Sequence, residues 1–214
     1  MVRKPIYQIV FLGPQGSGKG TQAEKLAADF KIPVIATGQI YRDEAKKKTV
    51  LGDKVASCVN QGKLVPDDIT NDLIIRRLGK KDCRRGFILD GYPRTLAQAE
   101  ALAAITSLTQ AISIDLPDRE AIARIAGRLI CNECGATYHL KANPPQEPGI
   151  CDKCGAALLA RKDDQAEAAL RQRLAIYHEQ IDPIVKFYEN QGILCRIDGR
   201  QSIDEVYRAV KKVF

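Results

Sequence analysis

The stretch from Ile6 to Phe30, IYQIVFLGPQGSGKGTQAEKLAADF, restricts the fold more than any other part of the chain. It begins with Ile6 to Leu12, a short apolar run rich in β-branched side chains, which is typical of a buried parallel strand. Gly13 to Gly18 then predicts a glycine-rich turn, and Gln22 to Phe30 has the composition of a helix. Backbone N–H groups of such a turn converge on a phosphate, and the helix N-terminus adds its positive end. This order therefore predicts a P-loop, with Lys19 reaching the phosphate.

The loop departs from the general motif G-x-x-x-x-G-K-[ST] at one position. Gly20 holds the final place of the motif, and Thr21 comes after it. The alternative interpretation is a glycine-rich turn without a ligand. The combination of strand, lysine and helix argues against that alternative.

Further along the chain, apolar runs that predict strands alternate with helical segments. This alternation indicates an α/β fold of the doubly wound type, in which helices cover both faces of a parallel sheet. The predicted strands are Ile6–Leu12, Pro33–Ala36, Phe87–Leu89, Ala111–Ile114 and Ile193–Ile197.

Composition limits the class of protein and its surroundings. The formal net charge is +7, which suits polyanionic partners such as nucleotide phosphates, nucleic acid or a membrane surface. No apolar run approaches the ~18 residues of a membrane helix. The N-terminal apolar run leads into a glycine loop rather than a signal-peptide cleavage site. The odd number of cysteines, seven, argues against a disulfide framework, so we expect a reducing, cytoplasmic location.

Four of the cysteines form two Cys-x-x-Cys knuckles with sixteen residues between them: Cys131, Cys134, Cys151 and Cys154. This spacing is typical of a zinc site in which four thiolates complete the tetrahedral shell and leave no open position. We therefore predict a structural metal rather than a catalytic one. Iron is the alternative metal, and free thiols are the alternative state. His139 is an alternative ligand, but the four cysteines already complete the shell.

Zinc sites of this shape often belong to proteins that bind nucleic acid, so the placement of charge matters. Between Cys131 and Gly155, only Lys141, Lys153 and the partly basic His139 could contact a phosphate backbone. Arginines stand instead at the borders of the segment: Arg124, Arg128 and Arg161. This layout favours a small segment that is stabilised by bound metal and flanked by arginines. A metal can supply the stability that a segment of this size lacks, because it has too few residues to form a large apolar core.

Several short motifs together resemble the adenylate kinase family of nucleoside monophosphate kinases, and in particular its bacterial long-lid, zinc-binding members. The loop GSGKGTQA, with its shifted Gly-Thr, has that family's form, and DGYPRT at Asp90 to Thr95 is a second family motif. The resemblance continues over essentially the whole chain through ATGQIYR, GKLVPD, GRLICNEC, CDKCG, RKDD, RQRL and IDG.

The resemblance implies three parts. A core of residues 1–35, 66–126 and 165–214 would hold a five-stranded parallel sheet with helices on both faces. Residues 36–65 would form a helical AMP-binding segment, and residues 127–164 a mobile lid with the four-cysteine zinc site.

The activity that the resemblance implies is reversible phosphoryl transfer from MgATP to AMP, giving two ADP, with lid closure excluding water. The partners would be ATP, AMP and ADP, with Mg²⁺ carried by ATP and a structural Zn²⁺, and the protein would be a monomer without nucleic-acid or membrane partners. The nearest alternative is a sibling kinase that uses GTP as donor or UMP or CMP as acceptor. A distant alternative is a zinc-bearing, nucleic-acid-binding ATPase.

The resemblance also assigns residues to the reaction, and arginine suits that task because its planar fork binds phosphate at two points. The catalytic residues would be Lys19, Arg94, Arg128, Arg161, Arg173, Asp163 and Asp164. ATP would be bound by Gly16, Ser17, Gly18, Lys19, Gly20, Thr21, Arg124, Arg128, Thr137, Tyr138 and Gln201. AMP would be bound by Thr37, Arg42, Lys63, Leu64, Val65, Gly91, Tyr92, Pro93, Arg94, Gln98, Arg161 and Arg173. Asp90, at the carboxyl end of a predicted strand, would hold magnesium through water. Helix N-capping is the alternative role for Asp163 and Asp164.

One spacing departs from the family pattern. Asp164 and Arg173 are nine residues apart, one more than the resemblance leads us to expect. One extra residue in a helix rotates all later side chains by about 100° around the helix axis. We therefore expect a π-bulge or a shifted helix start near residues 166–169.

Overall fold

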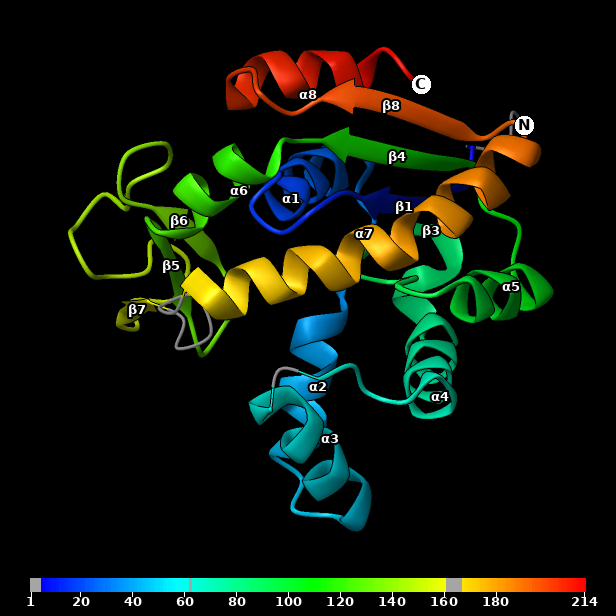
Figure 1. Cartoon of the computed structure of the whole chain (residues 1–214), viewed down its shortest axis with the longest axis horizontal. Helices are drawn as coiled ribbons and strands as arrows, with labels where there is room; N and C mark the ends of the chain where they lie inside the picture. Colours follow the sequence, from blue (N-terminus) through cyan, green and yellow to red (C-terminus); the bar gives the residue numbers. More distant parts are fainter. Residues whose placement is uncertain (1–4, 62, 161–166) are drawn as a thin grey trace.

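A five-stranded parallel sheet forms the centre of the molecule. The computed structural model describes residues 5–61, 63–160 and 167–214 of the chain. The strands are β1 (Tyr7–Leu12), β2 (Val34–Ala36), β3 (Gly86–Asp90), β4 (Gln110–Asp115) and β8 (Leu194–Asp198), in the order β2-β3-β1-β4-β8 (Figure 1). Each was predicted from the sequence to within one residue at either end. The α/β fold class is therefore confirmed.

Helices cover both faces of this sheet, because alternate side chains of its strands point to opposite sides. In β1, Val10 and Leu12 pack on one side, and Ile9 and Phe11 pack on the other. The Val10 side meets α4 (Asp67–Leu78), α5 (Leu96–Ile105) and α7 (Glu167–Asn190). The Ile9 side meets α1 (Lys19–Phe30) and α8 (Ile203–Lys211).

The carboxyl ends of the strands lie at one edge, and this edge receives the candidate site. The P-loop leaves β1 there, β3 ends at Asp90, and α6 (Asp118–Ile125) comes after β4. A short helix, η1 (Lys81–Arg85), precedes β3 at the opposite edge. Crevices outside the carboxyl ends of parallel strands are where open α/β sheets bind ligands.

Two insertions project from the sheet and have apolar clusters of their own. The first holds α2 (Thr37–Ala45) and α3 (Val50–Asn60), which extend below the sheet in Figure 1. Its buried residues are Tyr41, Val55, Val65 and Leu73. Because Leu73 belongs to α4, the packing of this segment continues past residue 65, and the boundary that we predicted there remains a prediction.

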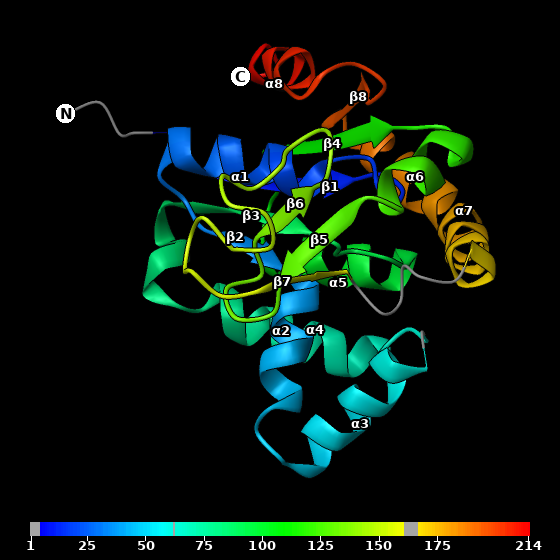
Figure 2. The ribbon, with the colours of Figure 1, turned by 90° about the vertical axis from the view of Figure 1, so that its left-hand side faces the viewer.

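The second insertion is a small antiparallel sheet, which lies in front of the core in the view of Figure 2. Its strands are β5 (Arg128–Cys131), β6 (Thr137–His139) and β7 (Leu158–Ala160), in the order β6-β5-β7. Its buried residues are Cys131, Ala136, Tyr138, Cys151 and Leu158. Two of these five are cysteines, so the insertion has little apolar core of its own.

Helix α7 includes most of the region, residues 166–169, where we expected a π-bulge or a shifted helix start. Every residue from Glu167 to Asn190 is α-helical, so the predicted π-bulge is absent over that range. Residues 161–166, where a shifted helix start would lie, are outside the described residues, and so are Arg161, Asp163 and Asp164. Over the described ranges, every helix is too short or too polar to cross a bilayer.

Candidate active site

The P-loop has the backbone that a phosphate cradle requires. Gly13, Gly16 and Gly18 have φ of 139°, 81° and 90°, a region that favours glycine. Lys19 Nζ turns back into the loop and donates to the carbonyls of Gly13 (2.7 Å) and Pro14 (2.8 Å). Within the described residues, the buried Ser17 Oγ has no hydrogen-bond partner. The loop therefore presents a positive charge and an unsatisfied hydroxyl to an anion.

Burial makes the charged form of Lys19 less favourable than it is in water. Burial lowers the pKa of Lys19 to about 8, although the residue stays partly accessible. Asp90 opposes this shift, whereas the positive charges of Arg94 and Arg128 add to it. Three residues far apart in the sequence thus lie within electrostatic reach of one lysine. Arg128 acts on Lys19 from the first position of β5 through its charge.

Gly20 explains the departure of the loop from the general motif. A Cβ on Gly20 would lie 3.2 Å from Asp90 Oδ2, closer than most side-chain contacts. Asp90 is the last residue of β3, so the carboxylate of one strand meets the first turn of α1. Glycine at position 20 therefore lets the carboxylate predicted to hold magnesium lie beside the P-loop.

The turn after β3 places Arg94 at the same edge. Arg94 Nε donates to Gly91 O at 2.8 Å, and a Cβ on Gly91 would lie 3.2 Å from Arg94 Nη2. The backbone N–H of Arg94 donates to Gln98 Oε1 at 2.7 Å. Arg94 itself is exposed. The turn therefore holds the guanidinium group through Nε and leaves the residue accessible.

Gln98, which we predicted to pair with adenine, is 2% exposed and already has internal partners. Its Oε1 accepts from Arg94, and its Nε2 donates to Asp67 Oδ1 at 2.6 Å. An amide can make four hydrogen bonds, so one donor and one acceptor position remain. Tyr92 Oη, buried beside it, donates to Asn71 Oδ1 at 2.7 Å. Sequence reasoning missed both partners: Asn71 lies in no motif, and Asp67, although it ends the motif GKLVPD, was given no role.

The remaining residues that we predicted to bind AMP come from the first insertion and the loop that follows it. Thr37 is buried at the start of α2, and its Oγ1 donates to Asp90 O at 3.2 Å. Arg42, one turn along α2, donates to Gln39 Oε1 from Nε (3.2 Å) and from Nη2 (2.6 Å). Val65 is buried, whereas Lys63 and Leu64 are exposed in the loop before α4.

The predicted donor-side residues lie in several elements. Arg124 is on α6, and its Nη2 donates to Arg200 O at 3.3 Å, next to the exposed Gln201. Thr137, at the start of β6, is exposed. The Tyr138 side chain is buried in the lid, so only its main chain could reach a nucleotide. Arg173 lies partly buried on α7.

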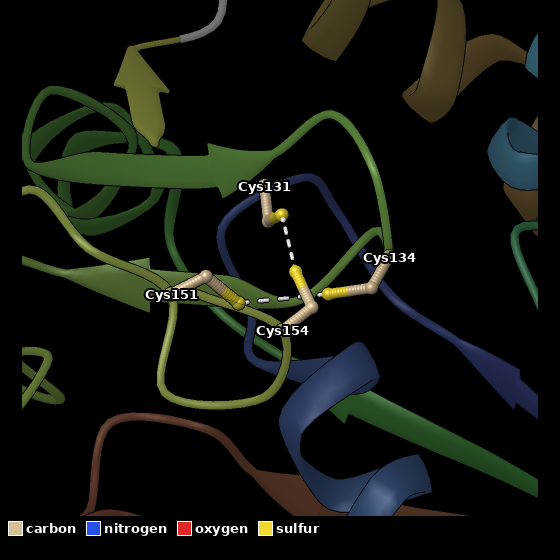
Figure 3. A group of neighbouring side chains, drawn as sticks. All are labelled: Cys131, Cys134, Cys151 and Cys154. Atoms are coloured by element: carbon tan, nitrogen blue, oxygen red, sulfur yellow. Dashed lines mark hydrogen bonds between the residues drawn. The ribbon is translucent and has the colours of Figure 1, made fainter. Parts of the chain in front are cut away.

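The four cysteines converge at one point of the lid (Figure 3). Their Sγ atoms lie within 4.8 Å of one another, with Cys131–Cys154 at 3.4 Å and Cys134–Cys151 at 3.5 Å. Zinc bound by four thiolates at about 2.3 Å would separate them by about 3.8 Å. The cluster therefore fits tetrahedral zinc, and soft thiolates would also accept iron. His139 lies outside the cluster, and its Nδ1 accepts from the backbone of Lys141 (3.0 Å) and of Ala142 (3.1 Å).

Tyr138 supports this cluster from within the lid. Burial opposes ionisation of Cys151, but hydrogen bonds from Tyr138 Oη and from the backbone of Lys153 and Cys154 outweigh it and lower the Cys151 pKa to about 6. Tyr138 Oη also accepts from Asp152 N at 2.8 Å. The side chain of Tyr138, a residue that we predicted to bind ATP, thus contacts one of the four cysteines, Cys151.

Comparison with known proteins decides the family. A family model described as adenylate kinase matches residues 11–193. An adenylate kinase of Lachnospira eligens is 45% identical over 211 residues, which cover 96% of this chain and 99% of that protein. An adenylate kinase of Methanocella arvoryzae is 47% identical over 95% of this chain and 96% of its own length. The chain belongs to the adenylate kinase family.

The lid of this adenylate kinase family member contacts α1 through its second knuckle and faces α2 across a cavity at its first knuckle. Lys153, in the second knuckle, forms an ion pair with Glu24 of α1 at 2.6 Å. Asn132 and Glu133, in the first knuckle, face Tyr41 of α2 across a cavity of about 370 Å³. These contacts join residues that are far apart in the chain, so no motif in the sequence pointed to them.

Proposed function

We propose that the chain catalyses reversible phosphoryl transfer from MgATP to AMP, giving two ADP. The observation that carries this proposal is a P-loop with Lys19 folded into it and the Asp90 carboxylate beside its first helical turn, where a Cβ on Gly20 would lie 3.2 Å from Asp90 Oδ2. Arg94 and Arg128 lie near enough for their charges to lower the pKa of Lys19. Phosphoryl transfer needs little covalent help from a protein. It needs several positive charges and a metal-binding carboxylate around one phosphoryl group, in a site that excludes water.

Each part of the site has a distinct task in this mechanism. The P-loop N–H groups and Lys19 bind the donor phosphates, while Arg42 and Arg94 bind the acceptor phosphate. Arg128 approaches from the lid and balances charge on the transferring group. Asp90 would hold the Mg²⁺ of MgATP through water, and that ion neutralises charge on the phosphates when bound. We assign no general base, because the acceptor is already an ionised phosphate.

Other residues of the proposed site come from the family pattern. Arg173, together with Arg161, would lie between the two nucleotides, and Asp163 and Asp164 would help to close the lid. Arg124, Thr137, Gln201 and the main chain of Tyr138 would bind the donor nucleotide. Thr37, Gln98, the turn at 91–93 and the loop at 63–65 would bind AMP.

Lid closure is the step that directs the phosphoryl group to AMP instead of water. The Lys153–Glu24 ion pair and the position of the first knuckle opposite α2 support an arrangement in which the lid lies over the site. We propose that the four cysteines bind zinc as a structural staple of this lid. Such thiolates need a reducing compartment, which supports a cytoplasmic location, and we propose a monomer.

The test is a phosphorus-31 NMR assay of the purified chain with MgATP and AMP. The same assay is run with UMP or CMP as acceptor, with GTP as donor, and without acceptor. We expect ADP to form rapidly only from ATP and AMP. Transfer to another nucleotide pair would overturn the proposed specificity, and rapid loss of ATP without acceptor would overturn the role of closure.

A matched pair of variants tests the arginine in the acceptor turn. Arg94→Met should lower kcat/KM by about a hundredfold, because it removes a charge-assisted phosphate contact. Arg84→Met is the control, since Arg84 is an exposed arginine in η1 at the opposite edge of the sheet. Equal activity of the two variants would contradict the role of Arg94.

A further inference from the structure

We propose that Gln39 is a positioning residue, which holds Arg42 toward the acceptor phosphate and packs against Gly135, the residue that follows the first cysteine knuckle. This inference rests on the proposed function. It concerns a residue that the phosphate-binding pattern does not include. It makes the acceptor arginine sensitive to the position of the lid.

Gln39 restrains the guanidinium of Arg42 from within the same helix. Its Oε1 accepts from Arg42 Nη2 at 2.6 Å and from Arg42 Nε at 3.2 Å, so two donors of one fork share one oxygen. Its Nε2 donates to Asp43 Oδ1 at 2.8 Å, which fixes the orientation of the amide. The amide therefore presents its oxygen, and not its nitrogen, to the arginine.

The lid also approaches this oxygen, through Gly135. Gly135, the residue after the knuckle ligand Cys134, has φ of 76° and donates its N–H to Cys131 O at 2.9 Å. A Cβ on Gly135 would lie 2.8 Å from Gln39 Oε1 and 3.5 Å from Arg42 Nη2. Real Cβ contacts essentially never fall below 3.0 Å, so a side chain at this position would displace the Gln39 amide.

The contact has a consequence for catalysis. With the lid in place, Gly135 limits the space in which the Gln39 amide can rotate, and the amide in turn limits Arg42. The acceptor arginine is then held in one geometry while the lid is closed, which favours a reactive alignment of the two phosphates. A misplaced amide would weaken AMP binding without touching the donor site.

The second knuckle offers a matched control. Gly155 comes after Cys154 as Gly135 comes after Cys134, and its φ is 73°. A Cβ on Gly155 would meet nothing within 4 Å. Gly135→Ala and Gly155→Ala therefore introduce the same backbone strain beside the metal site, and only Gly135→Ala moves Gln39.

The experiment compares both variants with the parent protein, each loaded with zinc and checked for metal content and melting temperature. We expect Gly135→Ala to raise the KM for AMP about tenfold, the effect of losing one hydrogen bond to a charged group, with the KM for ATP within about twofold. Gly155→Ala should leave both KM values within about twofold of the parent. Equal KM values for AMP in the two variants would overturn the proposal.

A second background separates positioning from simple structural damage. In Gln39→Ala the KM for AMP should rise by itself, and adding Gly135→Ala should then have little further effect, because no amide remains to displace. An undiminished effect of Gly135→Ala in that background would also overturn the proposal. If the parent protein does not phosphorylate AMP at all, the proposed function fails first, and that outcome is visible before any variant is made.

Discussion

Binding of a nucleotide phosphate beside Lys19 should load this lysine with a proton, and the number of protons can be worked out from the structure. In the free protein the pKa of Lys19 is about 8. The group is thus about half charged at pH 8 and about one tenth charged at pH 9. A phosphate within contact distance favours the charged form and raises the pKa again. Binding should therefore take up about 0.5 proton at pH 8, about 0.9 at pH 9 and only about 0.1 at pH 7.

The sign of the pH dependence comes from the same linkage. The protein binds the phosphate best when Lys19 is charged, which in the free protein holds below pH 8. Above that pH the apparent affinity for MgATP should fall, by up to about tenfold per pH unit. Phosphate groups are fully ionised in this range, since their second pKa is about 6, and do not add to the effect.

The assay is isothermal titration calorimetry of MgATP binding, in pairs of buffers with different ionisation enthalpies, at pH 7, 8 and 9. The difference in heat between two buffers gives the number of protons taken up. Lys19→Met is the control, titrated at nucleotide concentrations above its weaker Kd, and it should show no rise in proton uptake with pH. A parent protein with the same heat in both buffers at pH 9 would refute the buried, deprotonated lysine.

Three further perturbations test the fold and the metal site. Chelating the metal, or replacing one ligand in Cys134→Ser, should unfold the lid and leave the core intact, because the lid has few large apolar side chains. If proteolysis within the lid and the melting temperature were both unchanged, the metal would not stabilise the lid. Tyr92→Phe should lower the free energy of unfolding in urea by about 1–2 kcal/mol, since Asn71 loses its 2.7 Å partner; equal stability would show that this bond contributes nothing. Gly86→Ala should cost more than about 3 kcal/mol, because φ is 122° and the Cβ would lie 2.1 Å from Tyr7 O; a normal urea midpoint would contradict the tight β1–β3 contact.

The strands, the P-loop and the cysteine pairs could be read directly from the sequence. Each depends on residues that are neighbours along the chain. The apolar run before Gly13, the glycines after it and the Cys-x-x-Cys spacing all have physical requirements within a few residues. Helix α1 is the partial exception, because it begins at Lys19, three residues before the helix that we predicted from Gln22. The expected irregularity near the start of α7 is tested only in part: Glu167–Asn190 is unbroken α-helix, whereas a shifted helix start within residues 161–166 would lie outside the described residues.

The tertiary structure decided how distant groups act on one another. Only the strand order brings Asp90 and Arg94 to the P-loop, and only the position of the lid brings Arg128 there. The amide of Gln98 already serves Arg94 and Asp67, which no motif could show. Burial and charge depend on all groups that surround a side chain, whatever their distance along the chain.

The roles of Tyr138 and Gln39 show the same division. The family resemblance placed Tyr138 among the ATP-binding residues and gave Gln39 no role. The folded chain turns the Tyr138 hydroxyl toward Cys151 and sets the Gln39 amide between Arg42 and Gly135. A residue's identity determines which bonds it can make. The fold of the lid decides that Tyr138 meets Cys151, and the position of the lid beside α2 decides that Gly135 lies against Gln39, because hydrogen bonds and steric contacts act only over a few ångströms in space.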